Sequence, residues 1–156
     1  MSANLFGTAE SDKRILVVDF GAQYAQLIAR RVRESNVYSE IVSHELDAEN
    51  FAELKPSGII FSGGPASVNV EGAPKIDPAI YELGVPILGI CYGAQLIAQQ
   101  NGGSVEGNEK GEYGRTVVNV NESGILLSDS ETSTQQVWMS HFDSITSPPE
   151  GAMVTA

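Results

Sequence analysis

Residues 85–95 read VPILGICYGAQ, and this stretch decides the fold that we expect of the chain. The run from Val85 to Ile90 is apolar on both faces, as is typical of a strand buried in a parallel sheet. A helical stretch from Tyr92 to about Gln100 follows at once, and the sequence NGG at 101–103 ends it. The closely spaced glycines predict a sharp turn from strand to helix, with Cys91 at its apex.

This turn is the cysteine version of the G-x-S-x-G nucleophile elbow. It would lift Cys91 above the carboxyl edge of the sheet, where ligands of open α/β folds bind. It would also place the sulfur at a helix N-terminus, whose partial positive charge stabilises a thiolate. Most lone cysteines are small buried hydrophobes. Here a strand, two glycines and a helix coincide, so the pattern favours a nucleophile.

Strands and helices alternate in the residues before this turn. We expect strands at 14–19, 38–43 and 57–61, and the first of these runs is apolar on both faces and β-branched, as is typical of a strand buried in a parallel sheet. Helices are predicted at 23–34, with Leu27, Ile28 and Val32 on one stripe, at 47–54 with Asp47 as N-cap, and from Asp77 onward as a short helix. Such alternation predicts a parallel sheet covered by helices on both sides.

The texture changes after residue 103, where Gly, Asn and Ser become more frequent. Short alternating runs at 115–120, 135–140 and 152–155 predict further strands, in part antiparallel. We expect residues 1–13 to be a flexible leader and residues 14–156 to form one domain. The last residues are an apolar run with no closing element, so we expect this domain to be incomplete at its C-terminus.

Composition narrows the class of protein. A formal net charge of -11 argues against nucleic acid and anionic membranes as partners, because phosphates would be repelled. No run approaches the roughly 18–20 apolar residues that a membrane helix needs, and no signal peptide is recognisable. One cysteine cannot form an internal disulfide, which is typical of a reducing cytoplasm. We therefore expect a cytoplasmic location.

A second glycine-rich segment, SGGP at 62–65, closes the preceding predicted strand. Glycines there let backbone N–H groups face a ligand closely. Together with the Tyr92 N–H, such a group can form an oxyanion hole. The segment can equally be a tight turn without a ligand. It does not predict a phosphate cradle, because Pro65 removes an N–H and Ala66 stands where the phosphate loop of ATP pyrophosphatases has aspartate.

Four motifs in order carry a resemblance to the class I glutamine amidotransferases. They are DFGAQY at 19–24, SGGPASV at 62–68, GICYGAQ at 89–95 and WMSH at 138–141. The resemblance spans residue 14 to the C-terminus and implies a three-layer flavodoxin-like α/β fold. The first motif resembles the GMP synthetase branch of the family in particular.

The resemblance implies that Cys91 attacks the side-chain amide of L-glutamine, forms a thioester and releases ammonia. It assigns the oxyanion donors to the backbone of Gly64 and Tyr92. It assigns glutamine recognition to Gln95 and to the backbone around Ser140, Phe142 and Asp143. From the residues alone, Gln95 can also be a solvent-exposed helix glutamine. His141 is expected to shape the glutamine pocket and not to be the catalytic base.

Two departures from the family pattern bear on activity. Phe142 stands where glycine is usual, and it would be strained if that position needs a positive φ. The family's base and orienting acid lie in a His-Pro-Glu segment, which these 156 residues lack. We therefore expect this polypeptide alone to hydrolyse glutamine poorly.

The resemblance also implies partners and cofactors. The partner is an ATP-pyrophosphatase domain of the same enzyme, which uses ATP and Mg²⁺ to convert XMP to GMP, whereas this domain itself needs no cofactor or metal. A homodimer would form through that absent C-terminal domain. Two alternatives stay open: an amidotransferase subunit of another pathway, and a non-catalytic amidotransferase-like module that binds glutamine or a protein.

Overall fold

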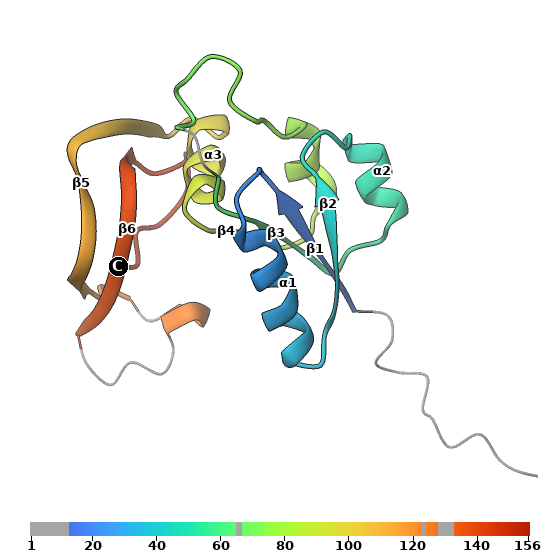
Figure 1. Ribbon diagram of the computed structural model, residues 1–156, viewed down its shortest axis with the longest axis horizontal. Helices are drawn as coiled ribbons and strands as arrows, with labels where there is room; N and C mark the ends of the chain where they lie inside the picture. The colour runs from blue at the N-terminus through green and yellow to red at the C-terminus, as the bar shows by residue number, and fades with distance from the viewer. Residues whose placement is uncertain (1–12, 65–66, 123, 128–132) are drawn as a thin grey trace, which may run out of the picture. The chain divides into compact units, whose positions relative to one another are not determined.

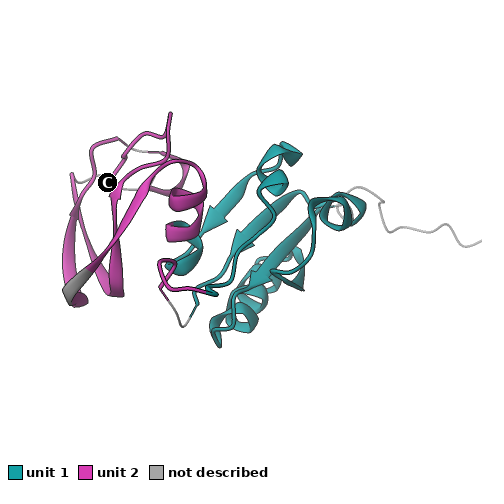
Figure 2. Ribbon diagram, turned by 90° about the horizontal axis from the view of Figure 1, so that it is seen from above, with its two compact units in different colours: residues 1–66, 72–94 teal, residues 67–71, 95–156 magenta. Residues whose placement is uncertain are grey.

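A computed structural model describes residues 13–64, 67–122, 124–127 and 133–156. The backbone contacts divide the chain into two compact units (Figure 2). The first takes in the residues up to 66 together with 72–94, and the second takes in 67–71 with 95–156. The leader predicted at residues 1–13 lies outside the described residues except for Lys13.

The first unit contains a four-stranded parallel sheet (Figure 1). Its strands are β1 (Arg14–Asp19), β2 (Tyr38–Ser43), β3 (Gly58–Phe61) and β4 (Ile87–Gly89), in the order β2-β1-β3-β4. All the pairings are parallel, as the alternating pattern predicts. The strand predicted at 85–90 is confirmed but shorter. The chain adds β2 on one side of β1 and then β3 and β4 on the other side. This order is the doubly wound arrangement of flavodoxin-like sheets.

Helical segments cover both faces of this sheet. Helix α1 (Tyr24–Glu34) packs Ala25 and Ala29 against Val17 of β1, with Ile60 of β3 on the same face. On the opposite face, Phe61 lies 6.2 Å ring to ring from Tyr81 of the 3₁₀ helix η1 (Pro78–Leu83). Helix α2 (Ala48–Glu53) packs beside η1. The three-layer α/β expectation is confirmed.

Two details of the helices differ from the sequence-based expectation. The buried stripe of α1 consists of Ala25 and Ala29 with Ile28 beside them, while Leu27 is 47% exposed. Alanine brings the helix backbone close to the sheet, so the larger Leu27 is left at the edge. The helix expected after Asp77 is a 3₁₀ helix of six residues, which ends at Gly84 with φ of 70°.

The second unit is built on an antiparallel ribbon. Strands β5 (Ser104–Asn119) and β6 (Thr134–Ser147) pair along most of their length, and the 3₁₀ helix η2 (Ile125–Leu127) lies between them in sequence. The strands predicted at 115–120 and 135–140 are confirmed and extended. Helix α3 (Tyr92–Gln100) begins in the first unit and continues into the second.

The strand predicted at 152–155 is wrong, because those residues adopt no regular structure. The carbonyl oxygen of Thr155 accepts hydrogen bonds from the N–H groups of Asn121 and Glu122, at 2.8 and 3.2 Å. Residues 152–155 are thus held beside residues 121–122 by these two hydrogen bonds and not by pairing along a strand. Among the described residues, no helix is long and apolar enough to span a bilayer.

Candidate active site

Cys91 lies at the strand-to-helix turn that the sequence predicts. Its φ is 52°, a value in the left-handed region that L-residues with side chains rarely adopt. The side chain is exposed, and helix α3 begins at the next residue. A residue forced into this conformation at the end of a parallel strand is the defining feature of the nucleophile elbow.

The two glycines of the elbow are required by close approach of the chain. A Cβ atom on Gly89 would lie 2.6 Å from the Cα of Ala94, and one on Gly93 would lie 2.5 Å from both the Cβ and the carbonyl oxygen of Phe61. No side chain fits at either position without moving the backbone. The two glycines therefore let the turn pack directly on the end of β3.

Hydrogen bonds join the elbow to the segment that follows β3. The N–H of Gly93 donates to the carbonyl of Ser62 at 3.1 Å, and the N–H of Ile90 donates to the carbonyl of Phe61 at 3.0 Å. A Cβ atom on Gly63 would lie 3.7 Å from the Cβ of Cys91. The glycine-rich segment thus lies beside the thiol, as expected from the sequence. Pro65 and Ala66 lie outside the described residues.

The predicted oxyanion donors, the N–H groups of Gly64 and Tyr92, belong to these two neighbouring segments. Gly64 packs on the ring of Tyr92, since a Cβ atom on it would lie 2.9 Å from the Tyr92 Cγ. Tyr92 is the first residue of α3, where N–H groups have no partner within the helix. No hydrogen bond from either amide to a described residue is present. The role of these two amides as oxyanion donors stays a prediction.

An aromatic cluster fixes Tyr92. Its ring lies 5.3 Å from that of Phe20, which in turn lies 5.6 Å from Phe61. The Tyr92 hydroxyl donates to the carbonyl of Pro74, and burial raises the pKa of this hydroxyl, so it stays a donor. Tyr92 is 1% exposed. These contacts fix the first turn of α3, which follows Cys91 directly.

In the second unit, Asp143 accepts hydrogen bonds from the side chains of Gln95, His141 and Ser67. The residue is 8% exposed. Its carbonyl oxygen accepts from Gln95 Nε2 at 2.8 Å and from His141 Nδ1 at 3.0 Å. Its carboxylate accepts a hydrogen bond from the Ser67 hydroxyl. Both lone pairs of the carbonyl are used, so this oxygen has no lone pair left for a ligand.

Gln95 is 7% exposed, which rules out the solvent-exposed alternative for its side chain. Phe142 and Ser140 lie on β6, where Phe142 is 53% exposed and Ser140 is exposed as well. Phe142 is not among the residues with positive φ, so the strain considered for it does not arise. A phenylalanine at this position is compatible with the backbone of an ordinary strand.

Two residues of this region escape sequence reasoning. Glu112 of β5 contacts His141, with Oε2 3.2 Å from Nε2. Ser67, which holds the Asp143 carboxylate, also accepts from the N–H of Asn69 at 3.2 Å. Ser67 lies inside the SGGPASV motif, and that was the only signal for it. Glu112 carries no local signal, because only the strand pairing places it opposite His141.

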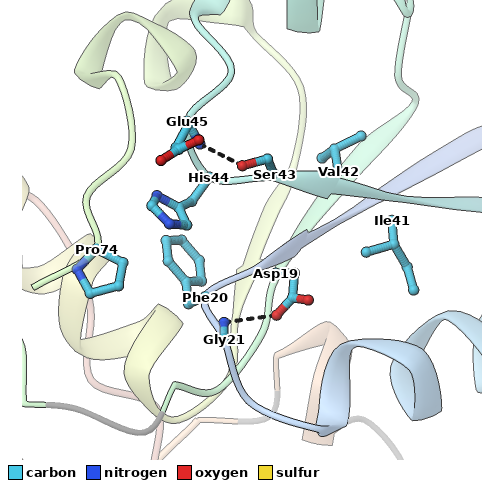
Figure 3. A pocket seen from close by; sticks show the side chains of 9 residues that line it. All are labelled: Asp19, Phe20, Gly21, Ile41, Val42, Ser43, His44, Glu45 and Pro74. Atoms are coloured by element: carbon cyan, nitrogen blue, oxygen red, sulfur yellow. Dashed lines mark hydrogen bonds between the residues drawn. The ribbon is translucent and has the colours of Figure 1, made fainter.

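A separate open cavity of about 560 Å³ lies at the carboxyl ends of β1 and β2 (Figure 3). Its lining includes Asp19, Phe20 and Gly21 of the first motif, together with His44, and does not include Cys91. The His44 ring stacks on Phe20 at 5.8 Å, and its Nδ1 lies 3.3 Å from the Lys75 carbonyl. Phe20 of the first motif therefore contacts Tyr92, and it also lines this cavity together with Asp19 and Gly21.

The chain belongs to the class-I glutamine amidotransferase family, whose description matches residues 16–156. This match spans both compact units and includes every predicted site residue.

Relatives named GMP synthase [glutamine-hydrolyzing] share about half of its residues. The protein of Nocardia farcinica is 54% identical over 147 residues, and that of Corynebacterium diphtheriae is 52% identical over 149 residues. These matches cover 94% and 96% of this chain but 28% of each relative. The chain is thus homologous to the glutaminase part of those enzymes.

Solved structures agree with the fold. A Thermoplasma acidophilum protein named as a subunit of GMP synthase superposes with a TM-score of 0.74 at 32% identity, covering 88% of this chain and 69% of its own. A glutamine amidotransferase of Thermotoga maritima superposes with a TM-score of 0.64 at 21% identity, covering 88% of this chain and 64% of its own. The second likeness concerns the fold alone.

Proposed function

We propose that Cys91 is the nucleophile of a glutaminase half-reaction. Its sulfur attacks the side-chain carbonyl carbon of L-glutamine, the C–N bond breaks, and the amide nitrogen takes the proton of the thiol and leaves as ammonia, so that a thioester remains. Water then attacks the thioester, releases glutamate and returns the thiol. The observation that carries this proposal is the φ of 52° at Cys91, enforced by glycines that admit no side chain.

The amides of Gly64 and Tyr92 stabilise the tetrahedral oxyanion of each step. A single well-placed donor of this kind contributes roughly 2.7–4 kcal/mol to the transition state. Their support comes from the contact of Gly64 with the Tyr92 ring and from the absence of an acceptor for either amide among the described residues.

Gln95, Ser140, Phe142 and Asp143 recognise glutamine. The contacts refine how they do so, because the Asp143 carbonyl is already filled by Gln95 and His141. Recognition therefore uses the Gln95 side-chain oxygen and those backbone N–H groups of the 140–143 segment that the pairing with β5 leaves free.

The ammonia serves the ATP-dependent conversion of XMP to GMP in a cytoplasmic enzyme. This proposal rests on the names of the relatives and on the 28% of their length that this chain spans. The remaining partners follow from it: an ATP-pyrophosphatase domain that binds ATP and Mg²⁺, and a homodimer formed through that domain. Mixing this chain with the ATP-pyrophosphatase part of a relative should yield GMP from XMP, ATP and glutamine slowly, and faster than the same mixture made with Cys91→Ser.

Turnover by this polypeptide alone is expected to be slow. The chain has two histidines, and each has a ring nitrogen held by a backbone carbonyl: His44 by Lys75 and His141 by Asp143. Such a contact leaves the other ring nitrogen able to act as a base, but neither ring forms a hydrogen bond with Cys91 among the described residues. Loss of the base lowers turnover by about 10⁶ in a well-studied triad enzyme.

Hydroxylamine provides the test, because it captures a glutamyl thioester as a hydroxamate even where hydrolysis is slow. The chain incubated with L-glutamine and hydroxylamine should form γ-glutamyl hydroxamate, whereas Cys91→Ser should form none. If the wild-type chain binds glutamine but forms no hydroxamate, the non-catalytic binding module is the correct interpretation. That alternative is favoured by the absence of a hydrogen bond between Cys91 and either histidine ring among the described residues.

A further inference from the structure

The ring of His141 is held between two oxygen atoms. Its Nδ1 lies 3.0 Å from the Asp143 carbonyl oxygen, and its Nε2 lies 3.2 Å from Oε2 of Glu112. A carbonyl and a carboxylate can only accept hydrogen bonds. Both ring nitrogens therefore face hydrogen-bond acceptors, one from the backbone of β6 and one from a side chain of β5.

This pair lies at an irregular part of the β5–β6 ribbon. The strand register passes from Gly107 opposite Asp143 to Glu112 opposite His141, with a shift between the two pairs. Among the described residues, Phe142 is the one residue of 140–143 without a partner on β5 in this register, and its neighbours His141 and Asp143 are paired on either side of the shift. The contacts of His141 and Gln95 therefore act where the pairing of β6 is irregular.

The contacts form one continuous path. Glu112 contacts His141, His141 donates to the Asp143 carbonyl, and Gln95 donates to the same oxygen from helix α3. The His141 side chain is 22% exposed and that of Glu112 is 47% exposed, so water screens the pair only in part. Removing the Glu112 carboxylate leaves Nε2 of His141 without this contact, so the ring is less well fixed and its hydrogen bond to the Asp143 carbonyl is weakened.

We propose that Glu112 is a positioning residue for glutamine recognition. Through His141 it fixes the Asp143 carbonyl and hence the direction of the backbone N–H groups in the 140–143 segment. Glu112 itself does not touch the substrate. The inference rests on the proposed function in one respect, namely that this segment binds glutamine.

The test is the affinity of the full chain for L-glutamine, measured by calorimetry or by NMR titration. Glu112→Ala should weaken binding about tenfold, the loss expected of a hydrogen bond to a charged group. Glu112→Gln, which keeps an acceptor but no charge, should lose less. The matched control is Glu106→Gln in the same strand, which should bind within about twofold of wild type, because surface changes have small effects.

A double-variant cycle separates positioning from a general structural effect. If Glu112 acts through His141, then Glu112→Ala should add no further loss in a His141→Asn background. Equal affinity of Glu112→Ala and wild type would overturn the proposal, and so would a full additional tenfold loss in the double variant.

If the wild-type chain binds no glutamine, that result counts against the proposed function, and the role of Glu112 is then tested separately. The ¹⁵N signals of the His141 ring then decide the positioning proposal. A change of the Nδ1 and Nε2 signals in Glu112→Gln, with none in Glu106→Gln, supports it. Identical ring signals in all three proteins contradict it.

Discussion

The turn at Cys91 can form only because its two glycines have no Cβ atom. The positive φ at Cys91 is sterically costly for a residue with a Cβ, by roughly 1–3 kcal/mol. It persists because Gly89 and Gly93 let the chain approach within distances that no side chain tolerates. This geometry was predictable from the sequence, since glycine spacing is a local signal.

The first prediction concerns Gly93. In Gly93→Ala, the added Cβ would lie 2.5 Å from Phe61, so the helix start or β3 must shift. We expect a loss of about 1–3 kcal/mol in the free energy of unfolding, as for other overpacked sites, measured by urea denaturation.

The matched control is Gly124→Ala, where a Cβ would meet nothing within 4 Å. It should stay within about 0.5 kcal/mol of wild type. Equal stability of the two variants would mean that the elbow is not packed as tightly as described.

Other residue-scale features could not be predicted from the sequence. The concern over Phe142 depended on a φ value that no residue pattern specifies, and it proves unfounded. The burial of Gln95 and its bond to Asp143 join residues that are 48 positions apart. Such contacts depend on tertiary packing, which local residue patterns do not specify.

At the scale of elements, strands and helices with strong apolar periodicity were predicted correctly. Strands β1 and β2 match their predicted ranges. The segment at 152–155 was predicted to be a strand from its alternation but has no paired strand. Pairing needs a partner edge that the sequence does not reveal.

Helix α2 provides the prediction at this scale. The Asp47 side chain accepts from the Asn50 N–H at 2.9 Å, and this backbone hydrogen bond, with a second from the Asn50 side chain, lowers the pKa of the Asp47 carboxyl. Because the folded-state pKa is lowered, the unfolded state takes up the proton first. The contribution to stability is thus present above the unfolded pKa and is lost as the pH falls through the folded one.

Asp47→Asn retains a capping side chain but cannot titrate. The stability advantage of wild type over this variant should shrink as the pH falls below about 4, the ordinary pKa of aspartate. Thermal unfolding at a series of pH values measures it. A difference between the two proteins that grows with acidity would contradict the capping role.

At the scale of the whole molecule, the sequence predicts one domain from residue 14 onward, and the contacts group its residues into two compact units. The change in texture at residue 103 was the visible signal, and the division itself falls at residue 95 within α3. A continuous helix hides such a boundary, because its periodicity does not change where its contacts do.

The antiparallel ribbon of the second unit exposes several large apolar side chains. Tyr113, Val117, Trp138 and Phe142 are 65%, 61%, 71% and 53% exposed. Trp138 is the only tryptophan of the chain, so its fluorescence reports on this ribbon alone.

We expect the emission of Trp138 to be that of an indole in water and to be quenched readily by iodide. Trp138 emission that is blue-shifted and shielded from iodide would contradict the exposure of this side chain. The variant Trp138→Phe provides the blank, since it removes all indole signal.

The central claim is that Cys91 is a nucleophile that acts on glutamine. The most direct measurement is the rate at which a diazoketone analogue of glutamine alkylates the chain, followed by intact mass. We predict one adduct at Cys91, formed faster than with a simple thiol under the same conditions, slowed by L-glutamine and absent in Cys91→Ser. Alkylation no faster than that of a simple thiol, or unaffected by glutamine, would contradict the claim.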